Sequence, residues 1–355
     1  MSKINIVDLA NKLGVSTATV SRALNNKEGV GEKTRNKVIE MAKEMGYTPN
    51  VIAKTMRKEM NVVVIFPIKD ENASYYTDLL WRGYKSGKRE VENFNIKFHE
   101  LYYEGQSFDE VDRKYLDKLA ALENQGVKID AILVYLIGDN FELTDYINDL
   151  YDNDVPVIAI HKKKHDLMAN FLVTDQAEVI GRLAGEMFGY FKKDFKNVLL
   201  IENQKEKFFG EDLTSFGFRA YLAKNHAESN IYSFDQFEED LDEKIKELLA
   251  EQKIDIAFAT TARASNYLAD KIENYKLKDD VFFIIAGRNK KSESYLRKDI
   301  CKCIIDNNPL EEGREAVKIL VNILIRNLHP KLEVGHIYKK EIKSKIIFKV
   351  MLQNS

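Results

Sequence analysis

The chain has 355 residues, of which 45% are hydrophobic and 31% charged, a composition typical of a globular protein with two or three domains. It contains no run of 18 apolar residues and no apolar signal peptide at its start, which argues against a membrane-spanning or secreted protein. We therefore expect a cytoplasmic protein. The net charge of −2 combines +5 in the first 60 residues with −7 in the remainder, and a basic end on an acidic body is typical of a protein that places that end on a polyanion.

The first 46 residues predict three short helices. Apolar residues recur at helical spacing over 5–13, Gly14 breaks this helix, and Ser16 is placed to cap a second helix, Thr17–Leu24. A third helix is predicted over 32–45, ending at a glycine. Its expected buried stripe consists of Val38, Ile39, Met41, Ala42 and Met45.

The second helix carries a polar face of short side chains. Thr17, Thr19 and Ser21 supply hydroxyl groups, and Arg22 adds one long cation. Short side chains allow a helix to enter the major groove of DNA, where hydroxyls reach phosphates and an arginine can bind guanine with two hydrogen bonds. A three-helix domain alone would leave the role open, but this face together with the basic charge predicts a helix-turn-helix DNA-binding domain.

A short segment follows that is too short to form a stable helix alone. Pro49 ends any preceding helix, Asn50 is a candidate cap, and Val51–Lys58 offers about two helical turns. Such a segment is suited to fold on contact with DNA or with a second copy of the chain.

After residue 61, short apolar runs alternate with amphipathic segments. The predicted strands are Val62–Pro67, Ile96–Tyr102, Ala131–Leu136, Val157–Ile160, Asn197–Ile201, Ile256–Ala259, Phe282–Ala286 and Cys301–Ile305. The predicted helices include Tyr76–Asn93, Asp109–Gln125, Gln176–Phe191, Ser215–Asn225 and Leu310–Asn327, and an acidic surface helix within 234–249. This alternation predicts an α/β fold with parallel sheets, arranged as two lobes with a cleft between them.

No catalytic or cofactor-binding motif occurs in this part. Phosphate-binding glycine loops, zinc-protease and nucleophile-elbow motifs are all absent from the sequence, so we expect neither an enzyme nor a bound cofactor. Cys301 and Cys303 are expected to be buried, reduced thiols. His161 and His165 with Asp166 are too few for a predicted metal site.

The string IVDLANKLGVSTATVSRALNNKEGVGEKTRNKVIEMAKEMGYTPNVIAKTMR resembles the headpiece and hinge of the lactose-repressor/galactose-repressor family. The resemblance implies that Thr17, Ala18 and Arg22 read bases. It also implies that Ser16, Thr19, Ser21 and Asn25 lie near phosphates. The hinge helix would contribute Asn50, Ala53, Lys54, Met56 and Arg57 to the minor groove, with Met56 as an apolar wedge.

The resemblance continues more loosely through GRLAGEMFGYF, SFGFRAYL and IIDNNPLEEGREAVKILVNIL, and implies a periplasmic-binding-protein-like core. The implied domains are a DNA-binding domain over 1–48, a hinge over 49–60 and an effector-binding and dimerisation core over 61–355. Crossings between lobes are expected near Thr174, Asp306 and Gly335. Lobe 1 would then hold about 61–173 and 306–334, and lobe 2 about 174–305 and 335–355.

Ligands in this fold lie at the carboxyl ends of strands, between the lobes. The candidate effector-binding residues at such positions are Tyr75, Tyr76, His161, Asp175, Gln176, Arg219, Thr261, Arg288 and Asn307. The chain departs from the family pattern at Thr214, at Thr260-Thr261 and at Ala286-Gly287-Arg288. These departures remove groups that usually hold sugar hydroxyls, so an anionic sugar derivative bound by Arg219 and Arg288 is an alternative to a neutral sugar.

Together, these expectations predict a transcriptional repressor. It would bind a pseudo-palindromic operator in double-stranded DNA as a homodimer and respond to a small sugar or sugar derivative. One alternative is a DNA-binding regulator without a small-molecule effector, controlled by a protein partner. Another is a solute-binding or enzymatic α/β protein with an incidental helical head.

Overall fold

The computed structural model describes residues 6–24, 27–45, 59–66, 74–102, 108–136, 141–161, 166–203, 212–326 and 337–352. The chain divides into two compact units, Met1–Glu59 and Met60–Ser355, which we call the headpiece and the core. Among the described helices, none combines the length and the apolar character that a membrane crossing requires. Asn25 and the hinge segment 50–58 lie outside the described residues.

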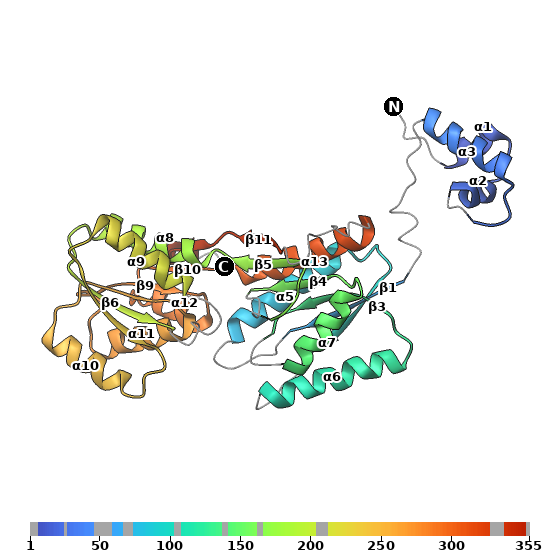
Figure 1. The fold of residues 1–355 in the computed structure, drawn as a ribbon. Coiled ribbons are helices and arrows are strands. Elements are labelled where there is room, and N and C mark those ends of the chain that lie inside the picture. The colour runs from blue at the N-terminus through green and yellow to red at the C-terminus, as the bar shows by residue number, and fades with distance from the viewer. Residues whose placement is uncertain are drawn as a thin grey trace. The chain divides into compact units, whose positions relative to one another are not determined.

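The headpiece contains three helices, α1 (Ile6–Leu13), α2 (Thr17–Leu24) and α3 (Glu32–Glu44) (Figure 1). As predicted, Gly14 takes a left-handed φ of 65° between the first two helices, and the Ser16 hydroxyl accepts a hydrogen bond from the Thr19 amide at 3.1 Å. The small core of the headpiece consists of Leu9, Ala10, Val20, Ala23, Val38 and Ala42. The prediction that Ile39 is buried was wrong: its side chain is 48% exposed, because one residue along a helix turns the side chain about 100° away from the position of Val38.

The core contains two six-stranded sheets. The first sheet has the order β11-β5-β4-β3-β1-β2 and the second has the order β12-β10-β9-β8-β6-β7. The strands of the first sheet, in chain order, are β1 (Met60–Ile65), β2 (Ile96–Leu101), β3 (Ile129–Val134), β4 (Val157–Ile160), β5 (Phe171–Asp175) and β11 (Tyr338–Ile342). Those of the second are β6 (Asn197–Glu202), β7 (Asn230–Asp235), β8 (Ile256–Ala259), β9 (Phe282–Ala286), β10 (Cys303–Asp306) and β12 (Lys345–Ile347).

Nine helices of the core are described. They are α5 (Ser74–Glu90), α6 (Phe108–Asn124), α7 (Phe141–Asp152), α8 (Ala177–Phe191), α9 (Leu213–Asn225), α10 (Leu241–Glu251), α11 (Ala262–Asn274), α12 (Lys290–Arg297) and α13 (Pro309–Arg326). All strand pairs are parallel except β10 with β12, which confirms the predicted α/β class with parallel sheets.

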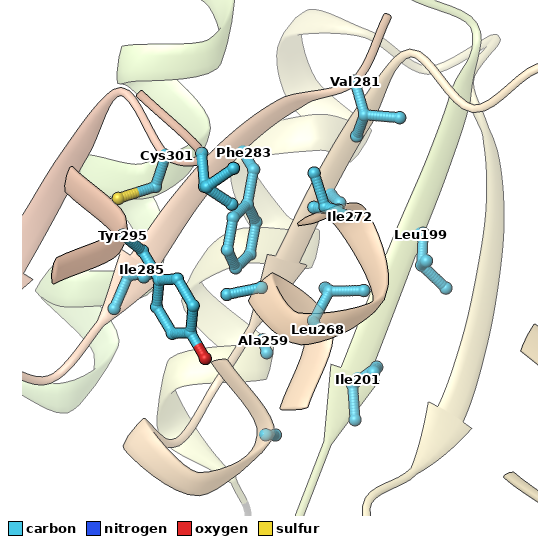
Figure 2. Packing of buried hydrophobic residues seen from close by; sticks show 14 of the residues in the cluster. Leu199, Ile201, Ala259, Leu268, Ile272, Val281, Phe283, Ile285, Tyr295 and Cys301 are labelled. Carbon is cyan, nitrogen blue, oxygen red and sulfur yellow. The ribbon is translucent and has the colours of Figure 1, made fainter. Parts of the chain in front are cut away.

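Each sheet is covered by helices on both faces, because alternate strand residues point to opposite sides. In the first sheet, Val62 and Val64 pack with α5 and α13, whereas Val63 and Ile65 pack with α6 and α7. In the second sheet, one face packs against α8 and α9, and the other against α10, α11 and α12. Figure 2 shows this latter cluster, in which Phe283 lies among aliphatic side chains of the sheet and of α11. The inner strands thus carry apolar residues on both of their sides, as buried parallel sheets require.

The last crossing between sheets differs from the prediction. Residues 335–355 were assigned to the second lobe, but β11 pairs with β5 in the first sheet and only β12 joins the second. The chain therefore changes sheet between Ile342 and Lys345, and not at Gly335. The charged sequence YKKEI of β11 is mostly exposed, which is why no apolar pattern marked it as a strand.

The two cysteines are buried and free, as expected. Cys301 precedes β10, so the predicted strand Cys301–Ile305 begins two residues too early. Burial raises the pKa of both thiols above the ordinary range, which keeps them protonated and unreactive near neutral pH.

Helices α5 and α13 touch through backbone atoms. A Cβ placed on Gly83 would lie 1.9 Å from the carbonyl oxygen of Leu310, and one on Gly313 would lie 2.3 Å from that of Leu80. Glycine at these positions lets α13 approach α5, and this approach fixes the first turn of α13.

We expect Gly83→Ala to lower the free energy of unfolding of the core by about 1–3 kcal/mol or more, because the added methyl group separates α5 from α13. Urea denaturation followed by fluorescence of Trp81, the single tryptophan, measures this change. Ser86→Ala, on the same helix, is the control and should stay within about 0.5 kcal/mol of the wild type. Equal urea midpoints for Gly83→Ala and Ser86→Ala would contradict the close contact between α5 and α13.

Candidate effector site and DNA-binding face

Four predicted effector residues meet at the carboxyl edge of the first sheet. They are Tyr76 of α5, His161 after β4, Asp175 at the end of β5 and Asn307 after β10. The rings of Tyr76 and His161 lie 4.5 Å apart, and the Asn307 amide donates a hydrogen bond of 3.1 Å to Asp175. We call these residues, together with Tyr135 and Glu312, the edge cluster.

His161 is held in an unusual backbone conformation. Its φ is 66°, in the left-handed region that few residues other than glycine and asparagine adopt. Its amide donates to the Val173 carbonyl at 2.7 Å, and its carbonyl accepts from the Thr174 hydroxyl at 2.5 Å. These bonds to β5 fix the peptide and place the imidazole against the rings of Tyr76 and Tyr135.

Glu312 is the most deeply buried charged group of the edge cluster. Its side chain is fully buried in the first turn of α13, and its Oε2 accepts a hydrogen bond of 2.8 Å from the Tyr76 hydroxyl. The same oxygen lies 3.8 Å from Nδ1 of His161. Its other oxygen, Oε1, is buried and has no hydrogen-bond partner among the described residues. Burial, and then the negative charge of Asp175, raise the pKa of Glu312 well above its ordinary value.

This raised pKa predicts a pH-dependent stability. The native state binds the Glu312 proton more tightly than the unfolded state, so the stabilisation is complete below the ordinary glutamate pKa. It is lost as the pH rises through the native pKa. The free energy of unfolding of the wild type should therefore fall relative to that of Glu312→Gln as the pH rises above the ordinary glutamate pKa of about 4.3. Urea titrations at several pH values test this.

Glu311→Gln is the matched control, because Glu311 lies in the same helical turn but is partly exposed and pairs with Arg314 at 3.5 Å. Its difference from the wild type should change little with pH. A constant difference between the wild type and Glu312→Gln across these pH values would rule out the perturbed carboxyl group.

The remaining candidates lie at the carboxyl edge of the second sheet or bridge to β11. Arg219 pairs with Glu202 at 2.5 Å, and Arg288 pairs with Glu293 at 2.7 Å. The Thr261 hydroxyl caps α11 and donates to Gln236 at 2.6 Å. Gln176 donates from Nε2 to Glu341 at 2.9 Å, which places it outside the edge cluster.

These ion pairs argue against the anionic ligand considered from the sequence. Each arginine that was expected to bind such a ligand already pairs with a glutamate, and Asp306 adds a further carboxyl group beside Arg288. Together with Asp175 and Glu312, these groups make the described strand ends acidic. A ligand that offers hydroxyl groups or a positive charge fits this lining better than an anion.

Sequence reasoning missed Tyr135, Glu202 and Glu312. Tyr135 was placed within a strand, but it follows the end of β3 and packs 5.5 Å from the His161 ring. Glu312 was read as part of a predicted helix, where an acid in the first turn is ordinary. Tyr75 was predicted as an effector-binding residue, but its side chain lies outside the described part of the structure.

The predicted base-reading residues share one exposed surface of the headpiece. The side chains of Ser16, Thr17, Ala18 and Arg22 are exposed, and those of Thr19 and Ser21 are half-buried. Val20 and Ala23, on the opposite side of α2, are buried against α1 and α3. Helix α2 therefore presents short side chains and one cation to the surface.

Residues 5–50 match the model of bacterial regulatory proteins of the lacI family. Residues 94–327 match the periplasmic binding protein domain. The chain belongs to the lacI family of bacterial regulatory proteins. This confirms the family inferred from the headpiece and the resemblance of the core to periplasmic binding proteins.

Catabolite control protein A of Staphylococcus aureus strain N315 is 26% identical over 223 residues, or 62% of each chain, so the match spans less than two thirds of that relative. The HTH-type transcriptional regulator MalR of Streptococcus pneumoniae strain R6 is 24% identical over 98% of this lacI-family chain and 99% of the relative. A solved complex of the transcriptional regulator CelR with cellobiose has a TM-score of 0.59 at 15% identity, covering 97% of this chain and 98% of that one. At this identity the last comparison shows the shared fold.

Proposed function

We propose that this lacI-family protein is a transcriptional repressor whose affinity for operator DNA is controlled by a small carbohydrate-like effector. The observation that carries the proposal is the edge cluster, which gathers two aromatic rings and several hydrogen-bonding groups where this fold binds ligands. The headpiece supplies the DNA-binding face, and the core supplies the sensor. The whole protein would act in the cytoplasm.

The chemistry of the edge cluster favours a polyhydroxyl ligand. The rings of Tyr76 and Tyr135 lie 5.9 Å apart and offer flat apolar surfaces for the C–H face of a sugar. Asp175 and Asn307 offer acceptors and donors for hydroxyl groups. Among the described residues, the two arginines that were predicted to bind the effector, Arg219 and Arg288, are paired with glutamates.

On the DNA side, Thr17, Ala18 and Arg22 would read bases, while Ser16, Thr19, Ser21 and Asn25 would contact phosphates. The hinge segment, with Asn50, Ala53, Lys54, Met56 and Arg57, would fold only on the operator, since two helical turns are too few to be stable alone. Effector binding would change the spacing of the two hinges and thereby permit or prevent that folding.

The proposal is tested with the full chain and a DNA fragment from its own upstream region. Fluorescence anisotropy gives the operator affinity with and without each member of a panel of mono- and disaccharides. Thermal unfolding under the same conditions shows which sugars bind. A sugar that raises the melting temperature and changes operator affinity is the expected result, and specific DNA binding that no sugar alters would refute effector control.

We expect a homodimer, because one headpiece reads few base pairs and two-fold symmetry lets two headpieces read a pseudo-palindrome. Light scattering coupled to size exclusion at micromolar concentration should give twice the chain mass of 41.0 kDa. A monomer both free and on DNA would rule out this assembly.

A second candidate function, control by a protein partner, is favoured by a groove on α5. Its volume is about 780 Å³, and it is lined by Arg82, Lys85, Ser86, Lys88, Arg89, Glu92, Glu100 and Leu310. The four basic residues outnumber the two glutamates, so the groove carries a net positive charge that fits an acidic partner. The double variant Arg82→Glu, Lys85→Glu tests this candidate. If sugars change its operator affinity as they change that of the wild type, the sugar effector alone explains the control of DNA binding.

A further inference from the structure

We propose that His161, Asp175 and Glu312 form a binding site for a divalent first-row transition cation of the Zn²⁺ or Mn²⁺ class. The ligand atoms that these three residues offer all lie within 4.8 Å of one another. They come from β5, from the residue after β4 and from the first turn of α13, so the fold gathers them from distant parts of the sequence.

The distances suit a shared ion after small side-chain movements. Zinc binds imidazole nitrogen and carboxylate oxygen at about 2.0–2.2 Å in a tetrahedral arrangement, so two ligand atoms of one ion lie about 3.3–3.6 Å apart. His161 Nδ1 and Glu312 Oε2, at 3.8 Å, lie close to this separation. The carboxylate oxygen of Asp175, which lies within 4.8 Å of the other two ligand atoms, would move closer on binding to become the third ligand.

Glu312 supplies an independent reason to place a cation here. Its side chain is fully buried, and Oε1 has no hydrogen-bond partner in the described part of the chain. A buried carboxylate oxygen without a partner is costly, and a cation would satisfy it. None of the described lysine or arginine side chains forms an ion pair with Glu312.

The donor set selects the class of ion. Imidazole nitrogen binds Zn²⁺, Fe²⁺ and Mn²⁺ better than it binds Ca²⁺ or Mg²⁺, which prefer all-oxygen sites. The Tyr76 hydroxyl donates to Glu312 and orients this carboxyl group, as groups around metal ligands commonly do. From the sequence we expected no metal site, and this proposal replaces that expectation.

The test uses the full chain, stripped of metal with EDTA and then desalted. Calorimetric titration with ZnCl₂ or MnCl₂ should show one site per chain. Glu312→Gln and His161→Asn should each weaken binding at least about tenfold. Asparagine suits position 161 because it tolerates the left-handed backbone.

Glu311→Gln is the control and should bind the ion as the wild type does. A Co²⁺ absorption spectrum of the wild type, with bands of four- or five-coordinate cobalt, provides a readout that does not depend on any variant folding. Absence of binding, binding unaffected by Glu312→Gln, or equal affinity for MgCl₂ would each overturn the proposal. Sugar-dependent melting shifts measured in EDTA report the proposed effector function separately, so the two failures can be told apart.

Discussion

Replacing Arg22 by alanine is expected to weaken binding to the cognate operator by about 1–3 kcal/mol, roughly tenfold to a hundredfold, with little effect on unrelated DNA. Arg22 is exposed at the last turn of α2, among side chains too short to compete with it for base edges. An arginine that forms two hydrogen bonds to guanine contributes to specificity, whereas a cation near phosphates strengthens binding to every sequence alike.

Anisotropy titrations on cognate and scrambled duplexes at two salt concentrations measure both effects. Lys43→Ala is the control, because Lys43 is an exposed cation of the headpiece in the last turn of α3 and is not on α2. It should change both affinities slightly and equally. If Arg22→Ala weakened cognate and scrambled DNA by the same factor, the base-reading assignment would be wrong.

Replacing Asp175 by alanine is expected to abolish the effect of the effector on operator affinity, while effector-free affinity stays within about twofold of the wild type. Asp175 ends β5 in the first sheet and accepts the hydrogen bond from Asn307, which follows β10 of the second. It therefore lies where a ligand between the sheets would contact both. Loss of a buried hydrogen-bonding group typically costs a ligand about 1–3 kcal/mol, enough to remove the response at working concentrations.

The same operator titrations, repeated over a range of effector concentrations, give the response curve. Asp194→Ala is the control, since Asp194 is exposed and precedes β6, at the opposite ends of the strands. A response of Asp175→Ala at wild-type effector concentrations would remove this residue from the effector site.

Most strands with apolar runs could be predicted from the sequence, including the edge strand Ile96–Leu101, but the inner strand Phe171–Asp175 and the edge strands of charged or polar sequence were not. Val157–Ile160 and Ile256–Ala259 are continuous apolar runs, and both were predicted with their observed bounds. The edge strands Asn230–Asp235 and Tyr338–Ile342 have few buried side chains, so they lack the pattern that reveals a strand. Since the last of these sets the third crossing, the error in the domain bounds follows from the same cause.

The candidate site was predictable where a polar residue follows a predicted strand or lies at an expected crossing between lobes. His161 met the first condition and Asp175 the second, and the structure brings them together with Tyr76. Glu312 did not, because its role depends on the contact between α5 and α13, which joins residues more than 200 positions apart. Arg288 comes shortly after β9 and Arg219 lies on α9, and the glutamate partners of both could not be identified without the fold.

The packing of α13 against the first sheet also has a consequence for synthesis of the chain. Strands β6 to β10 of the second sheet are contiguous in the sequence, so most of that sheet can assemble once residue 306 has left the ribosome. The first sheet begins at residue 60, yet α13 and β11 complete it only after residues 309–342 emerge. Until then, Val62, Val64 and Ile158 lack half of their cover. Until α13 emerges, α5 alone covers this face, so the nascent chain carries a partly uncovered apolar sheet face for most of translation, the kind of surface that is prone to aggregate before folding is complete.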